Sequence, residues 1–372
     1  MPDNQKLLLR ITCFFWLITK VAAYKTWIAS GRLYPVVPPF DFLDAVPAII
    51  HTALLGLSLL GLTLLLIFPQ EKLLQISTLV IIVGSCSLDV LRWQPWEYQF
   101  LFFLLIFIIN RNNAKTLYSA IIFVMASTYI YSGLHKINGG FLHSVWDFMI
   151  LQEFLGVSAA KIMQFKLHYL GLAIPVIEAL GGLGMLFVKR KLLPVSVLIA
   201  MHIFIIALLL SRGVAYVSVI PQWNTAMILF LLLFYYRESY QFTFSSIYAK
   251  KNKLVFLFWG VLPALSFVGL WDNYLSSSVY TGNMKHMDVC ISNIAPVAQM
   301  QPYFVKKDRR NLCDGNARLK LYEWAIKETR VLPYPEDWYF KRFKAKYERM
   351  YPGTNATFIV YKYPFKDRKI LK

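Results

Sequence analysis

Residues 46–68 read VPAIIHTALLGLSLLGLTLLLIF and contain no charged side chain. A helix of ~20 apolar residues is long enough to cross the ~30 Å hydrocarbon core of a bilayer. This stretch therefore predicts a membrane-spanning helix. It also implies that the neighbouring apolar segments fold in a lipid bilayer.

Comparable apolar windows recur through the first 271 residues, and we expect about nine spans. They cover residues 7–29, 46–68, 74–91, 97–110, 117–135, 167–187, 193–211, 214–236 and 254–270. The first window meets Lys20 and lacks a small-residue cleavage site, so we interpret it as a retained span and not as a signal peptide. The eighth contains Pro221-Gln222-Trp223-Asn224, and irregular backbone at that depth requires cover from protein or water.

The composition supports a membrane protein. Of the 372 residues, 57% are hydrophobic and 16% charged, and the mean hydropathy is +0.50, which excludes an ordinary soluble enzyme and a disordered chain. The last 101 residues nevertheless hold 19 of the 39 Lys and Arg and 10 of the 20 Asp and Glu. We therefore predict an all-α polytopic membrane bundle over residues 1–271 and a basic, soluble α+β domain over residues 272–372.

The tail has its own secondary-structure signals. Residues 288–294 and 357–363 are rich in β-branched and aromatic side chains and predict strands, whereas residues 336–351 predict a helix. Asn355-Ala356-Thr357 fits an N-glycan acceptor. The tail's positive charge favours anionic headgroups or an acidic or peptide partner, and no nucleic-acid-binding motif accompanies it.

The orientation follows from the loop charges. Twelve Lys and Arg lie in loops on the side of the N-terminus and seven in loops on the other side. This bias predicts a cytoplasmic N-terminus and, with nine spans, an extracytoplasmic tail. A disulfide between Cys290 and Cys313 is then one of two open alternatives, free thiols being the other. Residues 137–166 predict an amphipathic helix on the outer surface, or a simple connector.

Ionisable side chains inside a membrane body are candidates for a functional site. Asp89 ends the third span, Lys136 follows the fifth, Glu178 lies in the sixth and His202 in the seventh. Each also has a structural explanation: Asp89 paired with Arg92, Lys136 reaching the headgroups, Glu178 paired, and His202 packing helices by a hydrogen bond.

The stretch YSGLHKIN, residues 131–138, resembles the signature of the transmembrane region of the vitamin K-dependent gamma-carboxylases, also called the horizontally transferred transmembrane (HTTM) domain. Asp89, Trp93 and Tyr98 match the family's spacing, and the segments around Glu178 and His202 resemble its later spans. The likeness covers roughly residues 85–235. At Trp96 the chain departs from the family, which has a histidine there.

The resemblance implies that Lys136 is the base that deprotonates a quinol such as vitamin K hydroquinone, with Glu178, Asp89 and His202 completing the catalytic group. A lysine is protonated at neutral pH and becomes a base only where an apolar site disfavours its charge. We therefore expect Glu178, Asp89 or His202 to lie close enough to tune Lys136 or to orient a substrate hydroxyl, with the carboxylates held at a distance or paired elsewhere, for example with Arg92. The candidate substrate-binding residues are Trp93, Tyr98, Tyr131, His135 and Asn138, and we expect no metal.

Three classes of function remain open. The first is a carboxylase-like membrane enzyme acting on a quinol or another lipophilic substrate. The second is a non-catalytic membrane component whose basic outer domain binds a partner. The third is a transporter lined by Glu178 and the eighth span, although no inverted repeat is visible. Quinol binding by the purified protein would separate the first class from the others.

Overall fold

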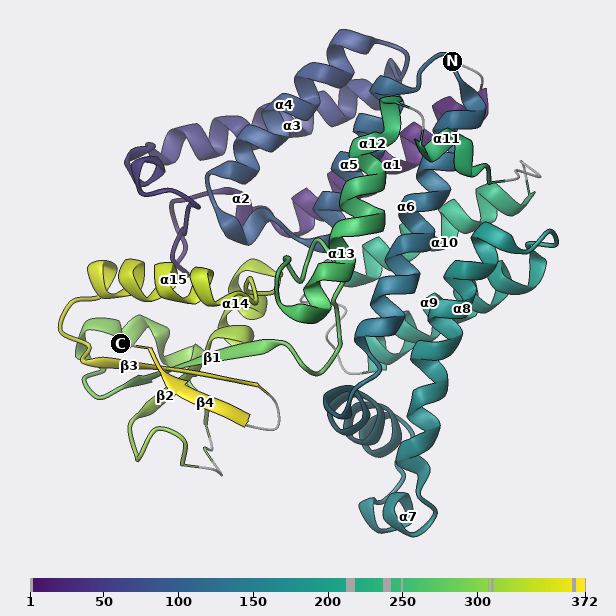
Figure 1. Ribbon diagram of the computed structural model, residues 1–372. Coiled ribbons are helices and arrows are strands. Elements are labelled where there is room, and N and C mark those ends of the chain that lie inside the picture. The colour runs from purple at the N-terminus through teal and green to yellow at the C-terminus, as the bar shows by residue number, and fades with distance from the viewer. Residues whose placement is uncertain are drawn as a thin grey trace.

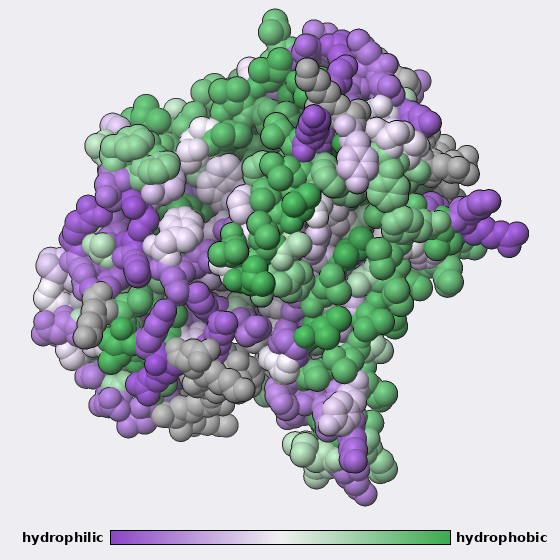
Figure 2. All heavy atoms as spheres, in the orientation of Figure 1, coloured by the Kyte–Doolittle hydropathy of each residue, from purple (hydrophilic) through white to green (hydrophobic). Residues whose placement is uncertain are grey.

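The computed structural model describes residues 3–211, 218–236, 242–248, 250–306, 308, 311–362 and 366–371. A body of helices carries a small sheet at one side, and the sheet belongs to the C-terminal tail (Figure 1). Hydrophobic side chains cover much of the body, whereas hydrophilic ones gather over the tail (Figure 2).

The body contains nine longer helical stretches among the described residues. They are α1 (Asp3–Ala22), α3 (Ala48–Ile67), α4 (Lys72–Ser87), α5 (Pro95–Ile109), α6 (Ala114–His135), η4 (Leu167–Leu172) continued by α8 (Ala173–Phe187), α9 (Leu192–Ser211), α10 (Ile220–Tyr236), and the run α12 (Lys253–Phe256), η7 (Leu257–Val261), α13 (Leu262–Leu265) and η8 (Ser266–Val268). The connecting turns are α2 (Tyr24–Trp27), η1 (Asp41–Ala45), η2 (Val90–Arg92), α11 (Phe244–Tyr248) and η6 (Lys250–Asn252).

Four helical stretches of the described chain are long and apolar enough to cross a membrane: α3, α6, η4 with α8, and α9. The stretches Lys72–Ser87, Pro95–Ile109, Ile220–Phe234 and Lys253–Val268 are apolar but shorter. At ~1.5 Å per residue they fall short of the ~30 Å core unless the bilayer thins around them. Membrane-type helices are therefore confirmed, whereas the count of nine spans remains a prediction.

The eighth predicted span is more regular than expected. Residues 214–217 lie outside the described part, and α10 begins at Ile220, so Pro221 occupies its first turn. Proline is tolerated there because the first helical N–H groups have no intrahelical acceptor to lose. The polar groups that follow have partners: Trp223 Nε1 donates to Gln99 Oε1 (2.6 Å), and Asn224 Nδ2 donates to the Ile220 carbonyl (2.8 Å).

Helix α6 runs through the middle of the body and packs closely on α8. A Cβ atom at Gly133 would lie 2.6 Å from the Pro175 carbonyl oxygen, and one at Gly182 would lie 2.7 Å from that of Ala126. Small residues let two helix backbones approach in this way. The close approach brings the C-terminal end of α6 against the first turns of α8.

After α6 the chain forms η3 (Phe141–Phe154), a helix of π-type hydrogen bonding, and then the short α7 (Ala159–Gln164). A helix was expected in this region from its apolar spacing. Trp146 Nε1 of η3 donates to the Leu167 carbonyl (2.9 Å), and the Trp146 ring lies against Gly171, so η3 is held to the start of the η4–α8 stretch.

The tail folds as an antiparallel sheet in the order β2-β1-β3-β4 with helices packed on it. Its elements are β1 (Lys285–Ile291), η9 (Ala295–Tyr303), β2 (Ala317–Lys320), α14 (Leu321–Thr329), α15 (Asp337–Met350), β3 (Ala356–Lys362) and β4 (Lys366–Ile370). The two predicted strands and the predicted helix are present as β1, β3 and α15. Cys290 and Cys313 form a disulfide, the first of the two open alternatives.

The tail is packed onto the loop between α1 and α3. The Glu328 carboxylate of α14 accepts hydrogen bonds from the backbone N–H groups of Leu33 and Tyr34 and from Trp324 Nε1. The Tyr34 ring is fully buried, 4.9 Å from the Trp324 ring and 5.3 Å from that of Phe343, measured between centroids. One apolar core therefore continues from the body into the tail.

Candidate functional site

Lys136 and Glu178 form a buried ion pair where α6 meets α8. Lys136 caps the C-terminus of α6, and its Nζ donates to Glu178 Oε2 (2.7 Å), Glu178 Oε1 (2.9 Å) and Ser132 Oγ (2.6 Å). The two side chains are only 10% and 6% exposed. Lys136 thus points into the bundle and does not reach for headgroups.

Glu178 lies close to Lys136, as expected, but it pairs with Lys136 directly instead of being held at a distance or paired elsewhere. A lone ammonium in an apolar bundle would be costly, and a carboxylate in direct contact offsets that cost. As an ion pair the two side chains together carry no net charge. Chemically, the carboxylate can accept a proton from a bound hydroxyl while the ammonium beside it stabilises the resulting oxyanion.

The pair opens on one side to an apolar cavity of about 80 Å³. Its remaining lining residues are contributed by η3, α8, α9 and the chain before β1, and they are Phe141, Val145, Met149, Ile150, Ile174, Met201, Phe204, Ile205, Leu208, Leu209 and Tyr280. A charged pair facing an apolar space is the arrangement expected of a site for a lipophilic molecule with one polar group.

His202 does not line this cavity and belongs to a separate hydrogen-bonded chain. Tyr129 of α6 contacts His202 Nε2 through its hydroxyl (2.8 Å), and His202 Nδ1 contacts Asn224 Oδ1 (2.7 Å). Because Asn224 Oδ1 only accepts, Nδ1 carries the proton and Nε2 accepts from Tyr129. Among the described residues no hydrogen bond joins His202 to Lys136, and its contacts are those of a histidine that packs three helices together.

Asp89 belongs to a second buried cluster. Its carboxylate pairs with Arg32 (2.5 Å) and accepts from the Val37 (3.2 Å) and Leu91 (3.1 Å) backbone N–H groups. The expected Asp89–Arg92 side-chain pair is replaced by this one. Arg92 instead donates to the backbone carbonyls of Thr26 and Trp27 in α2 and to His51 Nδ1. The expected convergence therefore brings together Lys136 and Glu178 but leaves Asp89 out.

Sequence reasoning missed a second buried pair in that cluster. Lys20 Nζ donates to Glu97 Oε1 (2.7 Å) and lies 3.2 Å from the centroid of the Trp27 ring. Cys86 Sγ contacts the same carboxylate oxygen at 3.7 Å. Both charged residues fall within predicted spans or at their ends, and that position was the available signal.

The candidate substrate-binding residues serve other contacts. The rings of Trp93 and Tyr98 stack at 5.0 Å between centroids, and Tyr98 Oη bonds Tyr334 Oη of the tail (2.9 Å). Tyr131 Oη donates to the Gly260 carbonyl (2.5 Å). Trp96, at the position where the carboxylases have histidine, is buried against Trp223.

His135 and Asn138 line a different cavity, a polar one of about 330 Å³ between the body and the tail. His135 Nε2 contacts Ser266 Oγ (2.9 Å), and Asn138 Nδ2 donates to the Thr281 carbonyl (3.0 Å). These residues therefore join the end of α6 to the start of the tail, next to the Lys136–Glu178 pair but outside its cavity.

Two residues of the site were not among the predicted site residues, although Ser132 lies within the stretch 131–138. Ser132 is the third hydrogen-bond partner of Lys136, and Tyr280 reaches the cavity from the chain before β1. In the described ranges no three His, Cys, Asp or Glu side chains are grouped so that they could hold a metal ion.

No protein-family model matches the chain, and no curated protein and no solved structure matches it either.

Proposed function

We propose that this chain is a multi-pass membrane enzyme in which the Lys136–Glu178 pair removes a proton from the hydroxyl of a quinol or another lipophilic substrate. The observation that carries the proposal is the buried ion pair facing an apolar cavity. The resemblance of residues 131–138 to the carboxylase transmembrane signature supports it, because that motif contains Lys136.

The step divides between the two side chains. The substrate hydroxyl donates its proton to a Glu178 oxygen, and the negative charge that stays on the substrate oxygen faces the Lys136 ammonium. Ser132 Oγ accepts from Lys136 at 2.6 Å and so fixes the position of the amine. A preorganised cation next to a developing oxyanion is effective in an apolar site, because water does not screen it.

The proposal covers proton abstraction and not glutamate carboxylation. The family's histidine is absent at Trp96, whose side chain is buried in an aromatic contact with Trp223. What the quinolate does next is therefore not assigned. We further propose a cytoplasmic N-terminus and an extracytoplasmic tail, which the loop charges and the Cys290–Cys313 disulfide support.

The test is quinol consumption by the purified protein in lipid nanodiscs. A prenylated naphthohydroquinone is incubated in air, where dissolved O₂ oxidises the deprotonated quinol to the quinone. The loss of quinol is followed by chromatography against empty nanodiscs. We expect Lys136→Ala and Glu178→Gln to lower the rate by ~10²–10⁴, the range for loss of an acid–base group. Lys161→Ala, which removes an exposed lysine of α7, is the matched control and should leave the rate unchanged.

Two results would contradict the proposal: a wild-type protein that neither binds nor consumes the quinol, or a folded Lys136→Ala variant with the wild-type rate. Thermal unfolding of each variant shows whether a lost rate reflects lost structure. A structural role for Lys136 predicts altered stability and an unaltered rate per folded molecule.

A further inference from the structure

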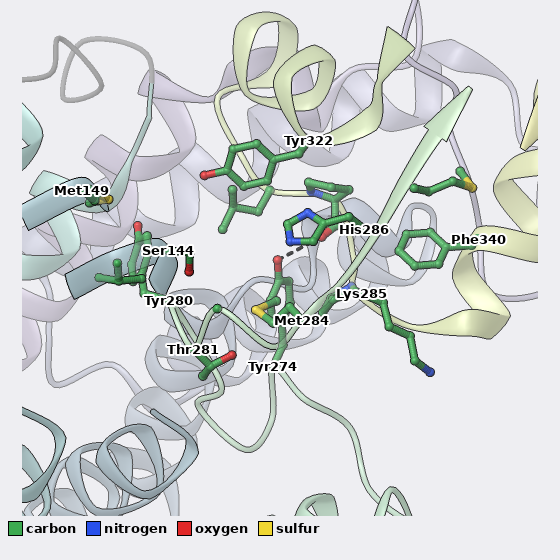
Figure 3. A pocket seen from close by; sticks show the side chains of 16 residues that line it. Ser144, Met149, Tyr274, Tyr280, Thr281, Met284, Lys285, His286, Tyr322 and Phe340 are labelled. Atoms are coloured by element: carbon green, nitrogen blue, oxygen red, sulfur yellow. Dashed lines mark hydrogen bonds between the residues drawn. The ribbon is translucent and has the colours of Figure 1, made fainter. Parts of the chain in front are cut away.

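A second cavity at the junction of the body and the tail, of about 260 Å³, is larger than the one beside Lys136 and smaller than the polar one of His135 and Asn138. Ser144, Val145 and Met149 of η3 line one part of it (Figure 3). The tail and the chain leading to it supply the rest, chiefly Tyr274, Tyr280, Met284, His286, Tyr322 and Phe340. The cavity is thus walled mainly by aromatic and methionine side chains from two parts of the fold.

This junction cavity adjoins the cavity of the Lys136–Glu178 pair. Val145, Met149 and Tyr280 line both spaces and so form a wall that the two cavities share. Methionine is flexible and fills irregular gaps, and Met149 can therefore change rotamer without disturbing the backbone.

The two cavities differ in volume, and therefore in the size of the ligand that each can hold. An apolar cavity of ~150 Å³ accommodates benzene, so about 80 Å³ beside Lys136 is too small for an aromatic ring. The junction cavity exceeds that requirement and has room for a fused two-ring system. An aromatic ring that reaches toward Lys136 therefore lies in the junction cavity, because the polar cavity of His135 and Asn138 shares no lining residue with the cavity beside Lys136. Only a substituent of the ring passes the shared wall.

Two polar groups in the wall lack partners. Tyr280 Oη is buried and has no hydrogen-bond partner in the described chain, which costs ~1–3 kcal/mol for a buried donor. His286 likewise makes no side-chain hydrogen bond to a described residue, and its ring stacks on Tyr361 (5.8 Å between centroids). Figure 3 shows Tyr280 next to Ser144, and His286 across the cavity from them.

Both groups are uncharged at neutral pH. Burial raises the pKa of Tyr280 well above its ordinary value, so its hydroxyl stays a donor. Burial also lowers the pKa of His286 to about 4, so its imidazole is neutral and offers one donor and one acceptor. The charged residue in the lining, Lys285, already pairs with Asp337 (2.8 Å), which leaves no free cation for an anionic ligand.

We propose that the junction cavity binds an uncharged planar aromatic ring bearing a hydroxyl or carbonyl group, with Tyr280 and His286 as its hydrogen-bonding partners. Aromatic walls suit a planar ring through stacked and edge-to-face contacts, and methionine sulfur adds favourable contacts with the ring edge. The binding assignment stands by itself. Only the further step, that the ring presents its hydroxyl to Lys136 and Glu178, rests on the proposed function.

The test compares 1-naphthol with 1-methylnaphthalene, which has nearly the same shape and no hydroxyl. Each is titrated calorimetrically into the full-length protein in nanodiscs, with empty nanodiscs as the blank. We expect 1-naphthol to bind more tightly, and Tyr280→Phe to weaken it ~3–10-fold, as loss of one hydrogen bond predicts. The same variant should leave 1-methylnaphthalene unchanged. Tyr169→Phe, an exposed tyrosine 61% accessible, is the matched control.

Blocking the cavity gives a second readout. Ser144→Trp places an indole in the junction cavity without altering the Lys136–Glu178 lining, and it should abolish binding of both probes. The assignment is overturned if Ser144→Trp leaves binding intact, if Tyr280→Phe weakens both probes equally or neither, or if neither probe binds the wild-type protein. Retained 1-naphthol binding with no quinol consumption would refute the proposed function alone.

Discussion

A double-mutant cycle tests whether Lys136 and Glu178 stabilise each other. The unfolding free energy is measured for each single substitution and for the two together, and independent side chains would give additive changes. Glu178→Gln leaves the Lys136 ammonium with uncharged acceptors, Ser132 Oγ and the amide oxygen of the new side chain. Lys136→Met leaves the carboxylate without any of the contacts described for it. Because both side chains are about nine-tenths buried, each single change strands an uncompensated charge and should cost ~3–5 kcal/mol of unfolding free energy.

The double variant Lys136→Met/Glu178→Leu removes both charges and fills the space with apolar atoms. Apolar replacement of a buried ion pair is often neutral, so we expect it to unfold within ~1 kcal/mol of the wild type. The coupling between the two changes is then at least ~5 kcal/mol, far above the ~0.5 kcal/mol scatter of independent sites. The same double variant should be inactive on quinol, which distinguishes catalysis from stability.

The assay is reversible unfolding by sodium dodecyl sulfate in mixed micelles, followed by tryptophan fluorescence and circular dichroism. The matched control is Glu323→Gln, which breaks the exposed Lys320–Glu323 pair and should cost at most ~1 kcal/mol. Additive single and double changes, or a Glu178→Gln cost no greater than that of the control, would refute the reasoning that the pair is ionised and mutually stabilised.

Three further outcomes are expected. Glu328→Ala orphans the N–H groups of Leu33 and Tyr34, and should loosen the tail by ~3 kcal/mol, seen as faster proteolysis of the tail. Acidification should also weaken the tail, because burial lowers the pKa of His286 to about 4. The contribution of His286 to the unfolding free energy is complete above the unfolded-state pKa of ~6.5 and falls with the pH, by ~2 kcal/mol at pH 5. His286→Phe should reduce this dependence when unfolding is measured as a function of pH. Cysteine introduced as Asn355→Cys, at an exposed position, should react with a membrane-impermeant maleimide in intact cells; reaction only after permeabilisation would reverse the proposed orientation.

Local patterns predicted the helices well and the partners poorly. An apolar window is a property of consecutive residues, so the body helices and the β-branched strands β1 and β3 were visible in the sequence. Strand β2 reads ARLK and β4 reads KDRKI, and such short charged strands at sheet edges lack an apolar alternation. Charged side chains at the edge protect a sheet from pairing with further strands. The same charges remove the apolar alternation by which a strand is predicted from sequence.

The candidate site shows the same limit. Intramembrane position alone selected Lys136 and Glu178, which are 42 residues apart and do pair. It also selected Asp89, whose partner Arg32 lies 57 residues away in a loop that no pattern connects to it. Partner choice depends on which helix faces meet, and that is decided by close approaches such as Gly133 against α8.

The contact between the loop after α1 and the tail imposes a parity rule on the topology. Tyr34 and Glu328 touch, so they lie on the same face of any bilayer that the chain crosses. The number of crossings between them must therefore be even. In the described chain eight apolar helical stretches lie between these residues, four of full length and four shorter. If one of the shorter stretches fails to cross, a second must fail with it. Crossings in this interval are gained or lost in pairs, and an odd count there is incompatible with the packed tail.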